Sequence, residues 1–217
     1  MDLSEFTPGS ALITVILIAL APFVAVMVTS FTKIVVVLSL LRNALGLQNV
    51  PPNIVLNGLA IVLTMFVMYP VGVEMIAIYE AGNTGDPATS QSILALSGEA
   101  RAPLEAFLSK HSDPEQRAFF LNTIQRIMGP DAAPISENDL IILIPAFTIS
   151  ELAEAFKIGF LIFLPFIVID LVIANILLAM GMMMLSPTIV SLPFKLLLFV
   201  MINGWAQLAQ GLVLSYF

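Results

Sequence analysis

The stretch Gly181-Met182-Met183-Met184-Leu185-Ser186-Pro187 interrupts two long apolar runs, and Pro193 and Lys195 follow shortly after it. Glycine before the methionines and proline after them predict a turn between two helices. Methionine side chains are unbranched and adaptable, so three in a row suit a surface that fits changing contents or seals against them. The alternative is a loop between membrane helices whose methionines serve packing alone.

The composition predicts a membrane protein. Hydrophobic residues make up 59% of the 217 residues and charged residues only 11%, and the mean hydropathy is +1.02. Soluble domains usually carry about 25% charged residues, so most of this chain expects lipid or other apolar chains around it. We interpret the chain as an integral membrane protein or part of one.

The residue types that support most catalytic and metal sites are absent or isolated. There is no cysteine, which excludes disulfides, thiolate metal sites and cysteine nucleophiles. The single histidine, His111, lies in a polar region and is predicted to be a solvated surface residue. The chain has no phosphate-cradling glycine loop, nucleophile elbow or basic stripe for nucleic acid. We therefore expect no enzyme activity, no metal or cofactor, and no nucleic-acid partner.

Hydropathy predicts four spans of the bilayer, each needing about 20 residues. The apolar runs cover 11–41, 54–79, the helix from about 140, and 188–217. A signal peptide cleaved after Ala19-Leu20-Ala21 is the competing interpretation of the first run. The preceding segment has two acids and no base, and Pro22 would follow the cut, so we expect an uncleaved, membrane-associated helix. Prolines in several runs predict bent or broken helices.

Three regions follow from the pattern of polarity: a hydrophobic region at 1–79, a polar helical insertion at 80–139, and a hydrophobic hairpin at 140–217. The insertion holds nine acids and four bases. Lys33 and Arg42 are the only bases near the connection that follows the first run. The positive-inside tendency places that connection in the cytoplasm and the acidic insertion on the periplasmic side.

Two helix starts are marked near the insertion. Asp113-Pro114-Glu115 is typical of an N-cap and first turn, and apolar residues recur at helical spacing until Gly129-Pro130. Ser136-Glu137-Asn138-Asp139 fits a capping box that opens the next helix. A partner helix for the amphipathic helix is expected from Leu94, Leu96, Leu104, Phe107 and Leu108.

Charges within the apolar runs need partners, because each costs about 2.5 to 3.5 kcal/mol at membrane depth. Glu151 and Glu154 share one helical face, and Lys157 follows Glu154 at the same spacing. They form either a proton or ion site, a solvated interfacial cluster, or one Glu154–Lys157 pair plus an acid awaiting a partner. Lys195 is the natural candidate for that partner. Asp170 is either a functional acid or a cap, and Lys33 is expected to snorkel to an interface.

Eight short strings occur in order along almost the whole chain. They are Phe31-Thr32-Lys33-Ile34, Leu41-Arg42-Asn43-Ala44-Leu45-Gly46, Val50-Pro51-Pro52-Asn53, Ile149-Ser150-Glu151-Leu152, Phe156-Lys157-Ile158-Gly159-Phe160, Leu164-Pro165-Phe166-Ile167-Val168-Ile169-Asp170, Gly181-Met182-Met183-Met184 and Leu192-Pro193-Phe194-Lys195. In this order and spacing they closely resemble the SctR family of type III secretion, called YscR or SpaP in injectisomes and FliP in flagella. The resemblance is weakest over 80–139.

The resemblance implies an all-α membrane protein of long kinked helical hairpins that assemble into a cone-shaped helical pore. In that family about five copies join four SctS-like chains and one SctT-like chain, and the assembly conducts unfolded secreted proteins. It implies the bacterial inner membrane as location, with part of the assembly raised toward the periplasm. Met182, Met183 and Met184 match the family's pore gasket, and Glu151 and Lys195 match a salt bridge between neighbouring subunits.

Two features favour an injectisome member over a flagellar one: the start almost directly at the first apolar run, and the segment 41–49. Two other functions compete with the export gate. One is a secondary transporter or proton channel that uses Glu151, Glu154 and Asp170 near the bilayer midplane, although the chain shows no inverted repeat. The other is a membrane scaffold whose charges only set the register of the helices.

Overall fold

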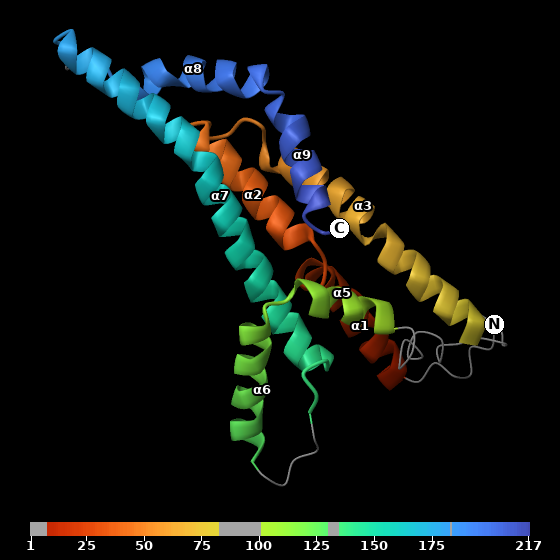
Figure 1. The fold of residues 1–217 in the computed structure, drawn as a ribbon. Coiled ribbons are helices and arrows are strands. Elements are labelled where there is room, and N and C mark those ends of the chain that lie inside the picture. Colours follow the sequence, from red (N-terminus) through yellow and green to blue (C-terminus); the bar gives the residue numbers. More distant parts are fainter. Residues whose placement is uncertain (1–7, 83–100, 130–134, 183) are drawn as a thin grey trace.

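The computed structural model describes residues 8–82, 101–129, 135–182 and 184–217, and over these ranges the chain is helical without any strand (Figure 1). The predicted all-α fold is confirmed. Helix α2 (Phe31–Ala44) is the centre of the fold, because it packs against α1, α3 and α7. Its buried residues are Lys33, Ile34, Val37, Leu38, Leu41 and Ala44.

The first apolar run is divided between α1 (Pro8–Met27) and α2, which meet at a bend of 65°. Our expectation of one helix through 11–41 is wrong at this point. The hydroxyl of Thr29 donates to the carbonyl of Ala25 at 2.6 Å, and that of Thr32 donates to the carbonyl of Val26 at 2.9 Å. Side-chain hydroxyls that take up backbone carbonyls compete with the helical ladder, which fits a break at this position.

Two helices are long: α3 (Asn53–Gly82) and α7 (Leu140–Ala179). Helix α7 continues through Pro145 and Pro165, so neither proline breaks it. Its 40 residues correspond to about 60 Å at 1.5 Å per residue. The hydrocarbon core of a bilayer is about 30 Å thick, so α7 is about twice as long as one crossing requires.

By length and composition, two helices among the described residues are able to cross a membrane, at 53–81 and 140–179. Two bent pairs, α1 with α2 and α8 with α9, raise the number to four if each pair counts as one span. The four predicted spans correspond to that upper number.

The C-terminal apolar run folds back as α8 (Pro187–Met201) and α9 (Gly204–Leu214), with a bend of 60° between them. Asn203 lies at the bend in the left-handed region, with φ 52°, which asparagine tolerates better than most residues. Helix α9 then lies against α3, and the segment after it contacts α5 through Tyr216 (Figure 1).

The polar insertion contains α5 (Ala102–His111) and α6 (Pro114–Met128), and both pack against α7. The predicted start of α6 is confirmed, since the carboxylate of Asp113 accepts a hydrogen bond from the backbone N–H of Glu115 at 2.8 Å. Gly129, with φ 79°, ends the helix. Helix α5 contains the expected Leu104, Phe107 and Leu108, whereas Leu94 and Leu96 lie outside the described residues.

The helix start predicted at 136–139 is also confirmed, because α7 begins directly after Asp139. The carboxylate of Asp139 accepts a hydrogen bond from the backbone N–H of Ser136 at 2.8 Å. Asp139 itself is the N-cap and its side chain makes no cap bond to α7, so the expected capping box with Ser136 as N-cap is wrong, although the start of the helix is as predicted.

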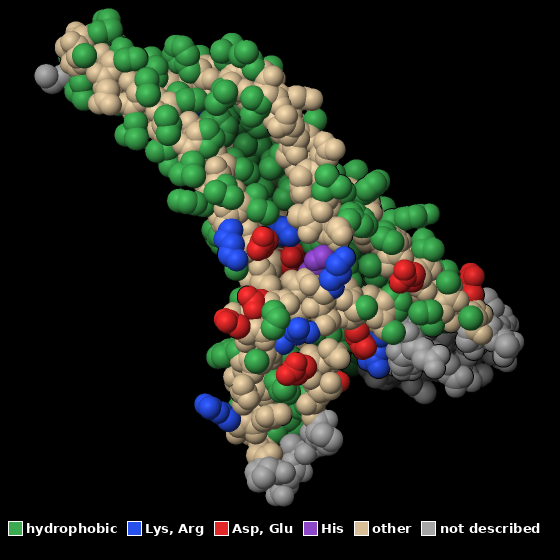
Figure 2. Space-filling view, viewed as in Figure 1, with side chains coloured by type: hydrophobic (Ala, Val, Ile, Leu, Met, Phe, Trp, Pro, Cys, Tyr) green, Lys and Arg blue, Asp and Glu red, His purple; other side chains and the backbone are tan. Residues whose placement is uncertain are grey.

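A buried apolar cluster ties the insertion to the membrane helices. Its members come from the α1–α2 bend, α3, α5, α7 and the segment after α9: Val28, Val67, Phe107, Leu108, Leu143, Phe147 and Tyr216. Away from this cluster, hydrophobic side chains cover the visible faces of α3, α7 and α8, while charged side chains gather where the insertion meets α7 (Figure 2).

Candidate functional site

The methionine turn begins where α7 ends in a Schellman motif. The backbone N–H of Met182 donates to the carbonyl of Leu177 at 2.9 Å, and that of Gly181 donates to the carbonyl of Leu178 at 3.0 Å. Gly181 has φ 71°, a conformation that glycine adopts without steric cost. The predicted turn between two helices is confirmed.

The turn lies at the far tip of the α7–α8 hairpin (Figure 1). The Met184 side chain is 100% exposed and that of Met182 is 41% exposed. Met183 lies outside the described residues. The two described methionines therefore have little packing role within this chain, and their apolar surface is free to contact another molecule.

Glu151 of α7 is buried, with 3% of its surface exposed, and it is paired with Lys33 of α2. Lys33 Nζ lies 3.5 Å from Glu151 Oε1, and the hydroxyl of Tyr216 donates to Glu151 Oε2. The expectation that Lys33 snorkels to an interface is wrong, because its side chain is enclosed between α2, α7 and Tyr216. Within the chain, the partner of Glu151 is Lys33 rather than Lys195.

Small residues on α7 allow this pairing. Glu151, Ala155 and Gly159 recur every four residues and therefore lie on one face of α7. All three are buried, and the side chain of Leu40 on α2 occupies the space that a Cβ at Gly159 would need. The close approach of α2 and α7 along this face places Lys33 beside Glu151.

Glu154 and Lys157 form a separate pair, with Lys157 Nζ 3.6 Å from Glu154 Oε2. Both side chains are exposed, so the pair contributes about 0.3–0.5 kcal/mol. Of the three predicted arrangements, the structure has the local Glu154–Lys157 pair together with an acid whose partner comes from another helix.

Lys195 and Asp170 form a second cross-helix pair. Lys195 Nζ lies 2.7 Å from Asp170 Oδ2, and the other carboxylate oxygen accepts a hydrogen bond from Ser191 at 2.5 Å. Lys195 Nζ also donates to the carbonyl of Ala44 at 3.2 Å. Ala44 is the last residue of α2, so the ammonium group lies at the negative end of that helix.

Asp170 lies inside α7, so of its two predicted roles the helix cap is wrong, and a functional acid stays a prediction. It is the counterion of a buried lysine and joins α7 to α8. The sequence carries a signal for the arrangement, because Ser191 and Lys195 are four residues apart and therefore reach the same side of α8.

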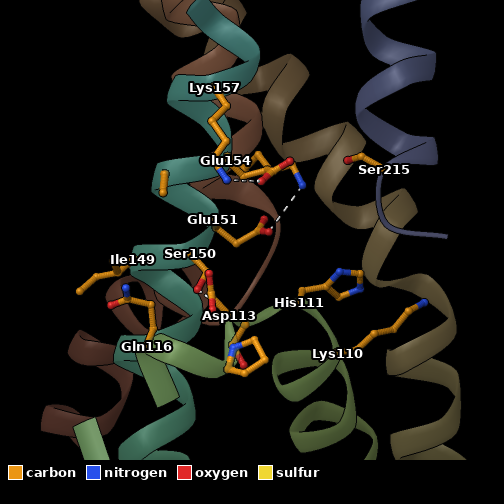
Figure 3. A pocket seen from close by; sticks show the side chains of 14 residues that line it. Lys110, His111, Asp113, Gln116, Ile149, Ser150, Glu151, Glu154, Lys157 and Ser215 are labelled. Carbon is orange, nitrogen blue, oxygen red and sulfur yellow. Dashed lines mark hydrogen bonds and ion pairs between the residues drawn. The ribbon is translucent and has the colours of Figure 1, made fainter. Parts of the chain in front are cut away.

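A hollow of about 410 Å³ opens beside Glu151, between α5, α7 and the segment after α9 (Figure 3). Glu151 and His111 face it from different helices, and Lys110 lies next to His111. His111 is half-buried, and its ring contacts Phe107 and Tyr216 with centroids 4.7 and 5.1 Å apart. The prediction of a solvated surface histidine is therefore wrong.

The surroundings of His111 disfavour its protonated form. Burial, followed by the positive charges of Lys110 and Lys33, lowers the pKa of His111 from 6.5 to about 4. The imidazole is therefore neutral at physiological pH. Sequence reasoning also missed Tyr216, because nothing in the local sequence shows that a residue after the last helix reaches Glu151.

A model of the FliP family matches residues 12–212 of the chain. The chain belongs to the FliP family. The match includes the methionine turn and both cross-helix ion pairs, whose residues all lie between Lys33 and Lys195. The Tyr216 contact lies just beyond the matched range.

Curated relatives of this FliP-family chain cover it almost completely. It is 53% identical over 206 residues to the pathogenicity-related ORF2 of Xanthomonas campestris pv. glycines, covering 94% of this chain and 95% of the relative. It is 50% identical over 210 residues to the hypersensitivity response secretion protein HrcR of Ralstonia nicotianae, covering 96% and 97%. It is 51% identical over 206 residues to the Yop proteins translocation protein R of Yersinia pestis, covering 94% of each chain. The predicted resemblance to the SctR family is confirmed.

Proposed function

We propose that this FliP-family chain is a core pore subunit of a type III secretion export gate and conducts unfolded proteins across the bacterial inner membrane. The relatives support this proposal, because two of them are named for secretion or for translocation of Yop proteins. The structural observation that carries it is the methionine turn, which projects from the tip of the α7–α8 hairpin with Met184 fully exposed. The virulence-related names also favour an injectisome over a flagellar system.

In this proposal the chain is a conduit and catalyses no reaction, and other components supply the energy. Met182, Met183 and Met184 of several copies surround one axis and form a soft apolar ring. Such a ring closes by contact between thioether side chains and opens around polypeptides of different shape, because methionine adapts at low cost.

We propose that about five copies assemble with four SctS-like chains and one SctT-like chain. The exposed apolar surface supports assembly, since α7 presents large hydrophobic side chains from Ile141 to Leu178. Helix α7 is also about twice as long as the bilayer core is thick. Protein partners are needed to cover the part that lipid does not reach, which agrees with an assembly raised toward the periplasm.

We also propose that Glu151 of one subunit pairs with Lys195 of its neighbour. In a single chain, Lys33 and Asp170 already neutralise these two groups. Assembly therefore has to join the two intrachain pairs into a larger network or exchange their partners. Either outcome keeps every buried charge compensated, which is required because an unpaired buried charge costs several kcal/mol.

The gasket is tested by replacing Met182, Met183 and Met184 with alanine in complexes assembled in a membrane. We expect assembly to be unchanged and the membrane to leak small ions, because alanine side chains are too short to close the pore around its axis. The matched control replaces three exposed methionines elsewhere, Met65, Met128 and Met201. If correctly assembled alanine variants leak no more than the control, the gasket role is contradicted.

A further inference from the structure

Tyr216 is a buried polar residue outside the helices and outside the residues that we assign to the pore. It lies two residues after the end of α9, yet only 3% of its surface is exposed. It belongs to the apolar cluster that joins α3, α5 and α7. A tyrosine in such a position needs a partner for its hydroxyl, and here the partner is Glu151.

The Tyr216 side chain makes different contacts with its two ends. The hydroxyl donates to Glu151 Oε2, and Lys33 Nζ lies 4.1 Å from the centroid of the ring. The ring stacks on Phe107 at 6.0 Å and meets the edge of His111 at 5.1 Å, both on α5. The backbone carbonyl of Tyr216 accepts a hydrogen bond from Lys110 at 3.4 Å. One residue therefore contacts the buried ion pair and the polar insertion together.

We infer that Tyr216 is a positioning residue that holds the Glu151 carboxylate toward Lys33 and locks α5 of the insertion against the same ion pair. The hydroxyl performs the first task and the ring performs the second. The position of the insertion and the state of the buried pair are thereby linked through a single side chain.

The ion pair needs this third group. A distance of 3.5 Å between Lys33 Nζ and Glu151 Oε1 is longer than a strong charge-assisted hydrogen bond, which measures about 2.7–2.9 Å. The second carboxylate oxygen is satisfied by Tyr216. Lys33 is in turn held over the electron-rich face of the ring, a contact that stabilises a desolvated cation.

Tyr216 also lines one of two hollows that share lining residues. The hollow of about 410 Å³ is lined by Lys33 and Glu151, and a second one of about 260 Å³ is lined by Tyr216 and by Glu74 of α3. Lys110 and His111 border both. Tyr216 lines the smaller hollow and contacts Glu151 and Lys33 of the larger one, so a smaller side chain at this position would leave the buried pair less covered on the side of α3.

The ring's task is tested by cysteine labelling, which the chain favours because it contains no cysteine. Ser112, at the end of α5, is buried, so Ser112→Cys reports when α5 leaves its place. We expect Tyr216→Leu to raise the labelling rate about threefold to tenfold, since leucine keeps apolar bulk but loses the aromatic contacts. Tyr216→Phe should leave the rate unchanged. Ala60→Cys, buried in another cluster, is the control reporter.

The hydroxyl's task is tested by a double-mutant cycle on the thermal midpoint of the full chain extracted from membranes. Tyr216→Phe should lower the midpoint in the natural background, because Glu151 loses its donor. In a Lys33→Met, Glu151→Met background the same change should have no effect or raise the midpoint, because the hydroxyl there has no carboxylate to bind. Tyr69→Phe, at an exposed tyrosine on α3, is the matched control.

Two results would overturn the inference. The first is an equal labelling rate of Ser112→Cys in the natural background and in the Tyr216→Leu background. This result would show that the ring does not hold α5. The second is an equal fall of the midpoint by Tyr216→Phe in both backgrounds, which would show that the hydroxyl does not act through Glu151. Neither measurement depends on secretion or on ion leak. Failure of this inference can therefore be distinguished from failure of the export-gate proposal.

Discussion

Lys195 Nζ lies 2.7 Å from Asp170 Oδ2, so the buried cation of α8 is neutralised by an acid of α7 in the same chain. The pair joins the two helices of the α7–α8 hairpin and also touches the end of α2 through Ala44. Because Ser191 binds the second oxygen of Asp170, both carboxylate oxygens are held by side chains on one side of α8. The hairpin that carries the methionine turn is therefore anchored by charge as well as by apolar packing.

Removing one member of this pair should destabilise the chain. Asp170→Asn leaves Lys195 without its counterion, and we expect a loss of about 1–3 kcal/mol. This value is below the 3–5 kcal/mol of a fully buried pair because the Asp170 side chain is 32% exposed. The thermal midpoint of the extracted chain measures the loss. The double variant Asp170→Leu, Lys195→Met should recover most of it, and a purely additive result would contradict the pairing.

Charge reversal at Glu151 separates the two partners that we assign to it. Glu151→Lys should lower the accumulation of folded chain and block assembly, because two lysines would then share a buried site. Lys33→Glu should restore accumulation, since it re-forms the intrachain pair. Quantitative immunoblots of the membrane fraction measure this effect.

Lys195→Glu tests the proposed pair between subunits in the same Glu151→Lys background. We expect it to rescue part of the assembly, measured by native mass of the extracted complex. Rescue by Lys33→Glu without any rescue by Lys195→Glu would limit the role of Glu151 to its own chain. Lys157→Glu is the control, because that lysine is exposed and pairs only with Glu154 among the contacts described.

Gly159 should tolerate substitution poorly. A Cβ at this position would lie 3.1 and 3.2 Å from the Cβ and Cγ of Leu40, and closer to one of its methyl groups. We expect Gly159→Ala to cost about 1–2 kcal/mol through overpacking between α2 and α7. Gly72→Ala on α3 is the control, since nothing lies within 4 Å of its Cβ position and alanine favours the helix. Equal midpoints for the two variants would rule out the close approach.

The low pKa of His111 predicts a dependence of stability on pH. The pKa of His111 is about 4 in the folded chain and 6.5 for an ordinary histidine. Between these two pH values the unfolded chain therefore binds more protons than the folded chain. The contribution of neutral His111 is fully present above about pH 6.5, falls as the pH is lowered to about 4, and is constant below that.

Thermal midpoints of the natural chain and of His111→Gln, measured from pH 7.5 to 4, test this dependence. The difference between the two curves isolates His111 from the carboxylates that titrate in the same range. We expect the natural chain to lose more stability than the variant as the pH falls. Parallel curves would contradict a lowered pKa of His111.

Local features were predictable because they depend on neighbours in the sequence. Asp113 and Gly129 bound α6 as expected, and Gly181 forms the turn before the methionines. The Glu154–Lys157 pair was also one of the predicted possibilities, since three residues along a helix bring two side chains together.

Tertiary packing decided the rest. The sequence shows four bases and six acids outside the insertion, but not which of them meet. The Thr29 hydroxyl binds a backbone carbonyl of α1 at the bend of 65° between α1 and α2. Beyond this bend α2 packs along α7, and Lys33 lies beside Glu151.

The return of α9 along α3 brings Tyr216 to the same carboxylate. Composition and periodicity by themselves determined a membrane-embedded helical chain with a methionine turn. The partners of its buried charges were set only by the packing of distant helices, because buried ions are stabilised by whichever opposite charge the fold brings within reach.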